Sequence, residues 1–314
     1  MKITMERVRQ SINPIRLQKA VLRKVFQKTN KGTVVYSAFP KSASHHFLNL
    51  VRLSFGNRFK IIIPKMSVGF GHNFMSQDAI LGDLTNFFKR LVLYGHFPYH
   101  YHNNLVMEGL GHDTKVMVSI RPLPDIVVSY KEHVDRSNYG PLDYCVNGLA
   151  ECNAQWPEFD DENKYDYLIH FIVPWYIRFA SGWLEGAKKW PLRFVTFEEQ
   201  ILYPVAFMMN TCDFLKMKVD PVELEEKLNP ERLSRLSFNV GVMGRGYKLL
   251  SQEQLDKIRE LVGQLGDSFV GSTLGKYLLY GYDGLPFEVM DVIRENSQGT
   301  SPDLFSLDQG NQGK

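Results

Sequence analysis

The chain has 314 residues, of which 44% are hydrophobic and 23% are charged. These values are typical of globular proteins and exclude a chain that is disordered over most of its length; no apolar run is long enough to span a membrane. The start, MKITMERVRQ, is not followed by an apolar segment, so it does not predict a secretory signal, and we expect a cytoplasmic protein. The three cysteines lack CxxC spacing, which predicts reduced packing thiols and no zinc site.

Residues 1–32 form a basic arm in which nine Lys or Arg residues stand against Glu6 alone, a net charge of +8. The rest of the chain has 28 basic and 33 acidic residues, a net charge of −5. Apolar residues recur at helical spacing between positions 21 and 26, so the arm is predicted to hold a helix docked on the protein itself. Contact of this arm with an anionic membrane is the less favoured alternative. We expect no nucleic-acid partner, and the sequence predicts no oligomeric state.

Strand and helix patterns alternate after this arm. Apolar, β-branched and aromatic runs predict strands over 33–39, 59–63, 115–120 and 192–196. Apolar residues at helical spacing predict helices over 47–55, 125–134, 174–185 and 205–215, and N-caps at Asp220 and Ser251 predict two more. This alternation predicts an α/β fold with a mostly parallel central sheet flanked by helices. We expect one domain over 33–294, followed by a flexible tail over 295–314 that is rich in Ser, Gly, Gln and Asp.

Two segments have the composition of anion-binding turns. The first, Pro40-Lys-Ser-Ala-Ser-His-His46, leaves a predicted strand and opens a helix, so unpaired amides and the positive end of the helix dipole face the loop. In the second, Arg121 ends a predicted strand and Ser129 lies within the following helix. Two anion sites on neighbouring strand ends suit a ligand with two separate phosphate groups. The pattern GxxxxGK[ST] is absent, which argues against a P-loop kinase or GTPase.

At this point the sequence resembles the sulfotransferase family that uses 3′-phosphoadenosine 5′-phosphosulfate (PAPS), in particular its cytosolic and bacterial small-molecule members. The family's PKSGTTW-like loop corresponds to 40–46, and its R-(x)7-S element corresponds to Arg121 through Ser129. The resemblance spans roughly residues 33–265. The further matches, in chain order, are Tyr94-Gly-His96-Phe-Pro98, Pro174-Trp-Tyr176 through Trp183-Leu-Glu185, Phe197-Glu-Glu199 through Pro204, and Gly241-Val-Met-Gly244-Arg-Gly-Tyr-Lys248.

The resemblance implies a P-loop-like sulfotransferase fold, PAPS as the sulfuryl donor, adenosine 3′,5′-bisphosphate (PAP) as the product, and no metal. It implies that His96 is the catalytic base and that Lys41 stabilises the leaving group. The residues that it assigns to the nucleotide are Lys41, Ser42, Ala43, Ser44, His45, His46, Arg121, Ser129, Phe197, Arg245 and Lys248.

The sequence departs from the family's pattern at several of these positions. Ala43, Ser44 and His45 replace Gly-Thr-Thr, and His46 stands where the family has a Trp that stacks on adenine. Phe197 replaces a Tyr. The late segment lacks the Arg-Lys-Gly triplet, so Arg245 and Lys248 are the nearest substitutes for its contacts with the 3′-phosphate.

His96 has an alternative interpretation, because His96, His100 and His102 have a spacing that metal ligands can show. The segment 99–104 has no evident carboxylate ligand and is predicted to be an aromatic surface loop, so the role of base is favoured over a metal site. Arg121 could instead form a surface ion pair.

The acceptor is the least determined part of the prediction. Residues 139–166 correspond to the family's variable region over the acceptor, and residues 151–166 carry six Asp or Glu residues against Lys164. A solvated acidic face is the simpler reading; the alternative is a cationic small-molecule acceptor, such as an amine-bearing natural product. Two further alternatives remain for the whole protein: a P-loop-type kinase and a non-catalytic nucleotide- or anion-binding protein.

Overall fold

We describe a computed structural model of the chain, which places residues 33–56, 60–62, 91–110, 113–136, 156–234 and 242–284. The basic arm, the C-terminal tail, Cys145 and Cys152 lie outside the described residues, as does most of the predicted acceptor region. Cys212 is a free, buried thiol.

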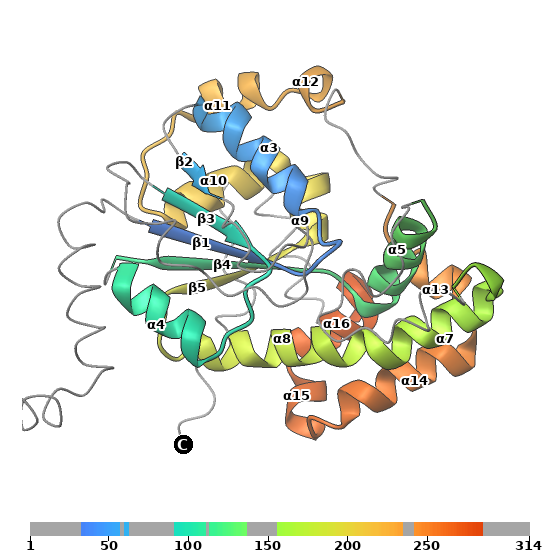
Figure 1. The fold of residues 1–314 in the computed structure, drawn as a ribbon. Helices are drawn as coiled ribbons and strands as arrows, with labels where there is room; N and C mark the ends of the chain where they lie inside the picture. Colours follow the sequence, from blue (N-terminus) through green and yellow to red (C-terminus); the bar gives the residue numbers. More distant parts are fainter. Residues whose placement is uncertain are drawn as a thin grey trace, which may run out of the picture.

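The centre of the fold is a parallel sheet of five strands in the order β2-β3-β1-β4-β5 (Figure 1). In the central part of the sheet, Val35 pairs with Leu93 of β3 on one side and with Val116 of β4 on the other. Parallel strands need crossover connections, and helices provide them here. The strands are β1 (Thr33–Ala38), β2 (Lys60–Ile62), β3 (Leu91–Gly95), β4 (Lys115–Ile120) and β5 (Leu192–Thr196).

Both faces of the sheet are covered, which explains why the strands are apolar runs rather than alternating ones. All six residues of β1 are buried. Val34, Tyr36 and Ala38 belong to one core cluster, and Val35 belongs to another on the opposite face. Figure 1 shows α3 and α11 over the first face and α4 and α8 over the second.

Helices make up most of the rest of the described chain. Their bounds are α3 (Ser44–Phe55), α4 (Tyr101–Leu110), α5 (Leu123–Arg136), α7 (Asp161–Phe171), α8 (Val173–Gly186), α9 (Phe197–Leu202), α10 (Pro204–Phe214), α11 (Pro221–Lys227), α12 (Pro230–Ser234), α13 (Gly246–Leu249), α14 (Gln252–Gly263), α15 (Asp267–Gly271) and α16 (Thr273–Tyr280). Two 3₁₀ turns complete the set, η3 (Trp156–Glu158) and η4 (Gly281–Gly284).

The predicted α/β class is confirmed, and the four predicted strands agree with β1, β2, β4 and β5 to within a residue or two. The predicted caps also form: the side chain of Asp220 accepts a hydrogen bond from Val222 N, and Ser251 forms a capping box with Gln254.

The prediction of a surface loop over 99–104 is wrong. Residues from Tyr101 onward form α4, because Leu105, Val106 and Leu110 recur at helical spacing and are buried under the sheet. The side chain of Asn103 donates to Pro98 O (2.9 Å) at the start of this helix.

Candidate nucleotide and sulfuryl-transfer site

The loop between β1 and α3 is fixed to the neighbouring strand by a closed set of hydrogen bonds. Phe39 N donates to Ser119 O (2.9 Å), and the Ser42 hydroxyl donates to Phe39 O (2.7 Å). The Ser119 hydroxyl in turn donates to Ser42 O (2.8 Å). Ser42 is fully buried, so its hydroxyl holds the loop together from within.

The same loop bends through two residues with left-handed backbone angles, Lys41 (φ 70°) and Ala43 (φ 64°). Such angles cost a residue with a Cβ about 1 kcal/mol, a cost that glycine avoids. Ala43 is the N-cap of α3, and its side chain cannot accept a capping hydrogen bond. The first backbone amides of a helix have no acceptor within the helix, so here the Ala43 side chain does not satisfy them either. Turns of this kind, at a helix N-terminus, are suited to anions.

His96 follows β3, which pairs directly with β1, so its ring lies beside the same loop. Its Nδ1 lies 2.7 Å from Ala38 O. Because a carbonyl oxygen can only accept, Nδ1 carries the proton and the lone pair of the neutral ring is on Nε2. Burial lowers the pKa of His96 to about 4, although the hydrogen bond to Ala38 acts in the opposite direction. The ring is therefore neutral at physiological pH and able to accept a proton.

The backbone after His96 is held as firmly as the ring itself. Phe97 O accepts hydrogen bonds from Ser37 Oγ (2.6 Å) and from Trp183 Nε1 (2.8 Å). Ser37 belongs to β1 and Trp183 to α8, so two elements fix the position of this segment. Trp183 packs in the core.

Lys41 lies in a strongly positive environment. Burial, and then repulsion from Arg121 and Arg136, lower the pKa of Lys41 to about 8, and Glu132 acts in the opposite direction. Repulsion among these three cations would be relieved by an anion placed between them. This is the property expected of a phosphate or phosphosulfate site.

Arg121 is nearly buried where β4 meets α5. Its NH1 donates to Lys41 O and its NH2 to Val242 O, both at 3.2 Å. Its guanidinium lies 4.0 Å from the ring centre of Phe197, a cation–π contact. Arg121 Nε is buried and has no hydrogen-bond partner among the described residues. This Nε–H group is therefore available to a ligand. Arg121 NH2 also lies 3.6 Å from Asp125 Oδ2, so Arg121 does form an ion pair, but the pair is buried and is not the surface ion pair considered from the sequence.

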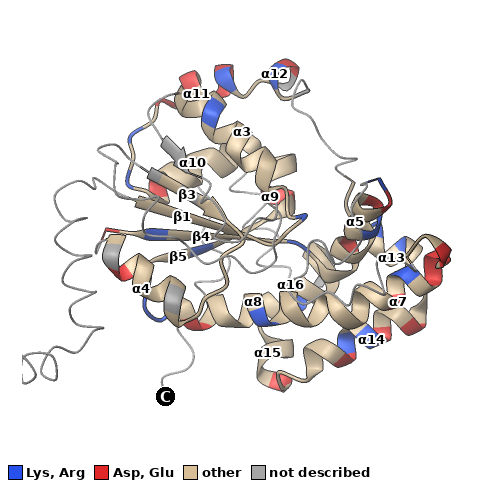
Figure 2. Cartoon of the chain, viewed as in Figure 1, with Lys and Arg blue, Asp and Glu red and all other residues tan. Residues whose placement is uncertain are grey.

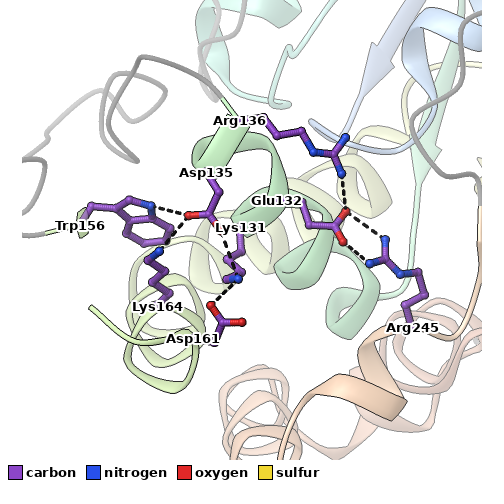
Figure 3. A network of polar contacts seen from close by, with 8 residues as sticks. All are labelled: Lys131, Glu132, Asp135, Arg136, Trp156, Asp161, Lys164 and Arg245. Atoms are coloured by element: carbon purple, nitrogen blue, oxygen red, sulfur yellow. Dashed lines mark hydrogen bonds and ion pairs between the residues drawn. The ribbon is translucent and has the colours of Figure 1, made fainter. Parts of the chain in front are cut away.

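The late segment around Gly244 lies across the beginning of α5. Gly244 N and Gly246 N donate to the two carboxylate oxygens of Asp125, at 2.9 and 2.7 Å. A Cβ on Gly246 would lie 2.2 Å from Pro124 C, so this approach requires glycine. We call residues 242–246 the strap. It brings Arg245 beside Glu132, which accepts two hydrogen bonds from it (Figure 3).

The remaining predicted nucleotide residues lie at different depths. Ser129 is partly exposed on α5, and His45 and Lys248 are exposed. Ser44 is buried and accepts a hydrogen bond from the Tyr94 hydroxyl (2.9 Å). His46 is buried, with Nε2 3.0 Å from Gln200 O in α9. Phe197 lies under Arg121. The roles of these residues toward a nucleotide stay predictions.

Three residues that the sequence analysis did not single out also belong to this region. Gln200 donates to Ser119 Oγ (3.0 Å), which ties α9 to the loop. Glu132 contacts Arg245 and Arg136. The pKa of His133 is lowered to about 4, first by burial and then by repulsion from Lys41 and Arg136. This repulsion means that the ring lies near Lys41. Helical spacing from Ser129 is the signal that could have identified Glu132 and His133, because residues three and four positions apart share a face.

Charged residues of both signs lie at the end of α5 and on α7, whereas the strands carry few of them (Figure 2). Within the described ranges, no group of three or more His, Cys, Asp or Glu residues could hold a metal ion. None of the helices placed in the structure is long and apolar enough to cross a membrane.

Comparison with known proteins supports the fold. No protein-family model matches the chain, and no curated protein matches its sequence. Among solved structures, one that is similar is the mouse sulfotransferase SULT7A1 complexed with PAP, with a TM-score of 0.57 and 14% identity. The chain has a sulfotransferase-like fold. The structural match covers 83% of this chain and 93% of the mouse chain, so the similarity extends over most of both chains. At this identity the likeness concerns the fold alone.

Proposed function

We propose that the protein is a sulfotransferase that moves the sulfuryl group of PAPS to a hydroxyl or amine of a small-molecule acceptor. The observation that supports this best is the convergence of three side chains on one loop at the carboxyl end of β1. His96 lies 2.7 Å from Ala38 O, Arg121 lies 3.2 Å from Lys41 O, and Lys41 is part of the loop itself. They come from three neighbouring strands of the sulfotransferase-like sheet.

The positive charge of the site fits the donor. PAPS, when bound, supplies an activated sulfuryl group together with a 5′ and a 3′ anionic group. Lys41 and the first amides of α3 are suited to the 5′ group, and the unused Nε of Arg121, with Ser129, is suited to the 3′-phosphate. Arg245 and Lys248 are the candidates to complete the 3′ site.

Two residues would carry the chemistry. In the transfer, the bond between sulfur and the bridging oxygen breaks and a bond forms from sulfur to the acceptor oxygen or nitrogen. Lys41 would neutralise the negative charge that develops on the bridging oxygen, and His96 Nε2 would take the proton that the acceptor loses. The neutral ring of His96 is in the protonation state that this role needs.

The acceptor class follows from the chemistry only as far as a hydroxyl or an amine. A cationic acceptor receives little support from the described acidic residues, because several of them have structural partners. Asp160 caps α7 through Asn163 N, Asp161 pairs with Lys131, and Asp166 accepts a hydrogen bond from Gln254. Asp161 thus joins α7 to α5, and Asp166 joins it to α14.

The test is binding followed by transfer. PAP at about 100 times its dissociation constant should stabilise the protein by roughly 2.7 kcal/mol in a thermal melt. Labelled PAPS should then lose its sulfuryl group to one or more compounds in a panel of phenols, alcohols and amines. Phosphate release from ATP without transfer from PAPS would instead favour a kinase. Binding of PAP without any transfer would favour a non-catalytic nucleotide-binding protein.

A further inference from the structure

The carboxylate of Glu132 lies among the cations that a nucleotide phosphate would use. Arg245 donates to both of its oxygens, through NH1 at 3.0 Å and through NH2, and Arg136 NH2 lies 3.4 Å from Oε2 (Figure 3). The hydrogen bond from Arg245 is the main cause that holds the pKa of Glu132 below its usual range. Glu132 is also close enough to Lys41 to raise the pKa of that amine.

Its place on α5 puts Glu132 next to the predicted 3′-phosphate contacts. Glu132 follows Ser129 by three residues, so the two side chains lie on one face of the helix. Arg245 is presented to this face by the strap, whose backbone is fixed to Asp125 at Gly244 and Gly246. The Arg245 backbone is therefore held, whereas its side chain, 23% exposed, can exchange one partner for another.

The geometry of the pair explains why a phosphate would compete with it. Two parallel N–H bonds from one guanidinium to two oxygens are the arrangement that arginine makes with carboxylates and with phosphates alike. Both partners of this ion pair are partly exposed, and such pairs contribute little to stability, so the pair can be exchanged at small cost. A carboxylate left close to a bound phosphate would also repel it.

We propose that Glu132 is an internal competitor of the 3′-phosphate: it holds Arg245 in the ligand-free protein and gives it up when a ligand with a 3′-phosphate binds at Arg121 and Ser129. This inference rests on the proposed function and concerns ligand selection at that site. Glu132 is a specificity-determining residue in this view, because it weakens every ligand that needs Arg245 and leaves others unaffected.

A purely structural role for Glu132 predicts the opposite sign. If the pair only orients Arg245 for the ligand, then removing the carboxylate should loosen Arg245 and weaken binding. If Glu132 competes, removing its charge should strengthen the binding of PAP. The direction of the change therefore decides between the two roles.

The experiment measures the affinities of PAP and adenosine 5′-phosphate by calorimetry for wild type and Glu132→Gln. We expect Glu132→Gln to bind PAP about threefold to tenfold more tightly, while adenosine 5′-phosphate changes less than about twofold. The gain should shrink at high salt, because both the attraction of Glu132 for Arg245 and its repulsion of the phosphate are screened. It should also become smaller in an Arg245→Ala background, where there is no guanidinium to compete for and only the direct repulsion remains.

Asp135→Asn is the matched control. It removes the same charge from the same helix, but Asp135 contacts Lys131, Lys164 and Trp156 and faces α7 (Figure 3). We expect it to leave the ratio of the two affinities unchanged. Denaturant unfolding of each variant confirms that it is folded at the assay temperature.

Weaker PAP binding by Glu132→Gln, or an equal change for both ligands, would overturn the inference and leave the proposed function standing. An equal gain in Asp135→Asn would also overturn it, since the effect would then be general electrostatics. Failure of the folded wild type to bind PAP at all would overturn the proposed function, and this inference with it.

Discussion

One ring nitrogen of His96, Nδ1, is hydrogen-bonded to the protein backbone. Because Nδ1 donates to Ala38 O, the protein backbone selects the tautomer whose Nε2 can accept a proton. Burial favours the neutral ring, and a neutral ring is the form that a base must have before the reaction. The contact with Ala38 O thus sets the orientation and the tautomer of the proposed base, and burial sets its neutral charge state.

We therefore predict that His96→Ala retains PAP affinity but lowers the turnover of PAPS by about 10²- to 10⁴-fold. The measurement combines PAP calorimetry with single-turnover transfer. His100→Ala removes an imidazole from the same segment and should leave turnover nearly unchanged. A parallel loss of PAP affinity in His96→Ala would instead make His96 a residue that shapes the nucleotide site.

Lys41 should make PAP binding depend on pH in the alkaline range. Its pKa is lowered to about 8 in the free protein by burial and by two arginines, and bound anions would raise it. The amine is then protonated in the complex but loses its proton in the free protein above pH 8. Affinity is full below pH 8 and should fall as pH rises beyond it, by up to about tenfold per unit.

Calorimetry between pH 7 and pH 10 tests this dependence. Lys41→Arg keeps a cation whose pKa stays above the range, so the variant should show a flat profile whatever its absolute affinity. A flat profile in wild type, or the same slope in Lys41→Arg, would assign the pH dependence to another group.

At the scale of elements, the strap depends on close backbone contact with α5. A Cβ at position 246 would lie 2.2 Å from Pro124 C and 2.5 Å from Asp125 N, both of them backbone atoms that cannot swing aside. We predict that Gly246→Ala destabilises the protein by about 1–3 kcal/mol, with part of PAP affinity lost because Arg245 is displaced. Urea unfolding and PAP calorimetry measure the two effects.

Gly263→Ala provides the comparison for this prediction. Nothing lies within 4 Å of a Cβ at position 263, near the end of α14. Alanine favours helix by up to about 1 kcal/mol over glycine, so the variant should be neutral or slightly more stable. If Gly246→Ala were equally harmless, the strap would not be packed against α5 as described.

The sequence predicted elements well where one physical signal dominated. Runs rich in apolar and β-branched residues marked β4 and β5, and the cap of Ser251 marked the start of α14. It did not predict β3, because the apolar run from Leu91 is too short to be assigned by periodicity alone. It also missed α7, whose first turn is acidic and was taken for a solvated run.

Within the site, chemistry was easier to predict than placement. The positions of Lys41 and Arg121, each just after a predicted strand, indicated anion binding, and the structure brings the two segments together. The partnership of Glu132 with Arg245 joins residues 113 positions apart, and only tertiary packing creates it. No local pattern carries information about a contact of that kind.

At the scale of the whole molecule, two buried histidines and one partly buried histidine predict sensitivity to acid. Burial lowers the pKa of His46, His96 and His133 to about 4 from an ordinary value of 6.5. Above pH 6.5 these rings are neutral in both states. Between pH 6.5 and 4 the unfolded chain binds protons that the folded protein does not, so the free energy of unfolding falls as pH falls.

The buried carboxyl of Glu198 has the opposite effect on how stability depends on pH. Burial raises the pKa of Glu198 to about 7, although the Tyr277 hydroxyl donates to it at 2.6 Å. Its protonation therefore favours the folded state as pH falls from 7 to 4.5. Three histidines against one glutamate leave a net uptake of about two protons on unfolding, so stability should still decrease.

Urea unfolding at pH 7, 6 and 5 measures this balance. We expect a steady decrease in the free energy of unfolding, and a smaller decrease in His46→Gln, which removes one of the three titrating rings. A constant or rising stability over this range would show that the three rings titrate alike in the folded and unfolded states.

The sheet order has a consequence for biosynthesis. Of the five strands described in the sheet, the central strand, β1, is synthesised first, yet its two neighbours are β3, which begins at Leu91, and β4, which begins at Lys115. An apolar segment destined for the middle of the sheet must therefore leave the ribosome long before anything can pair with it. Such exposed segments are where nascent chains aggregate or bind chaperones. The loop after β1, which we propose holds the nucleotide, therefore follows a strand whose two pairing partners are both synthesised later.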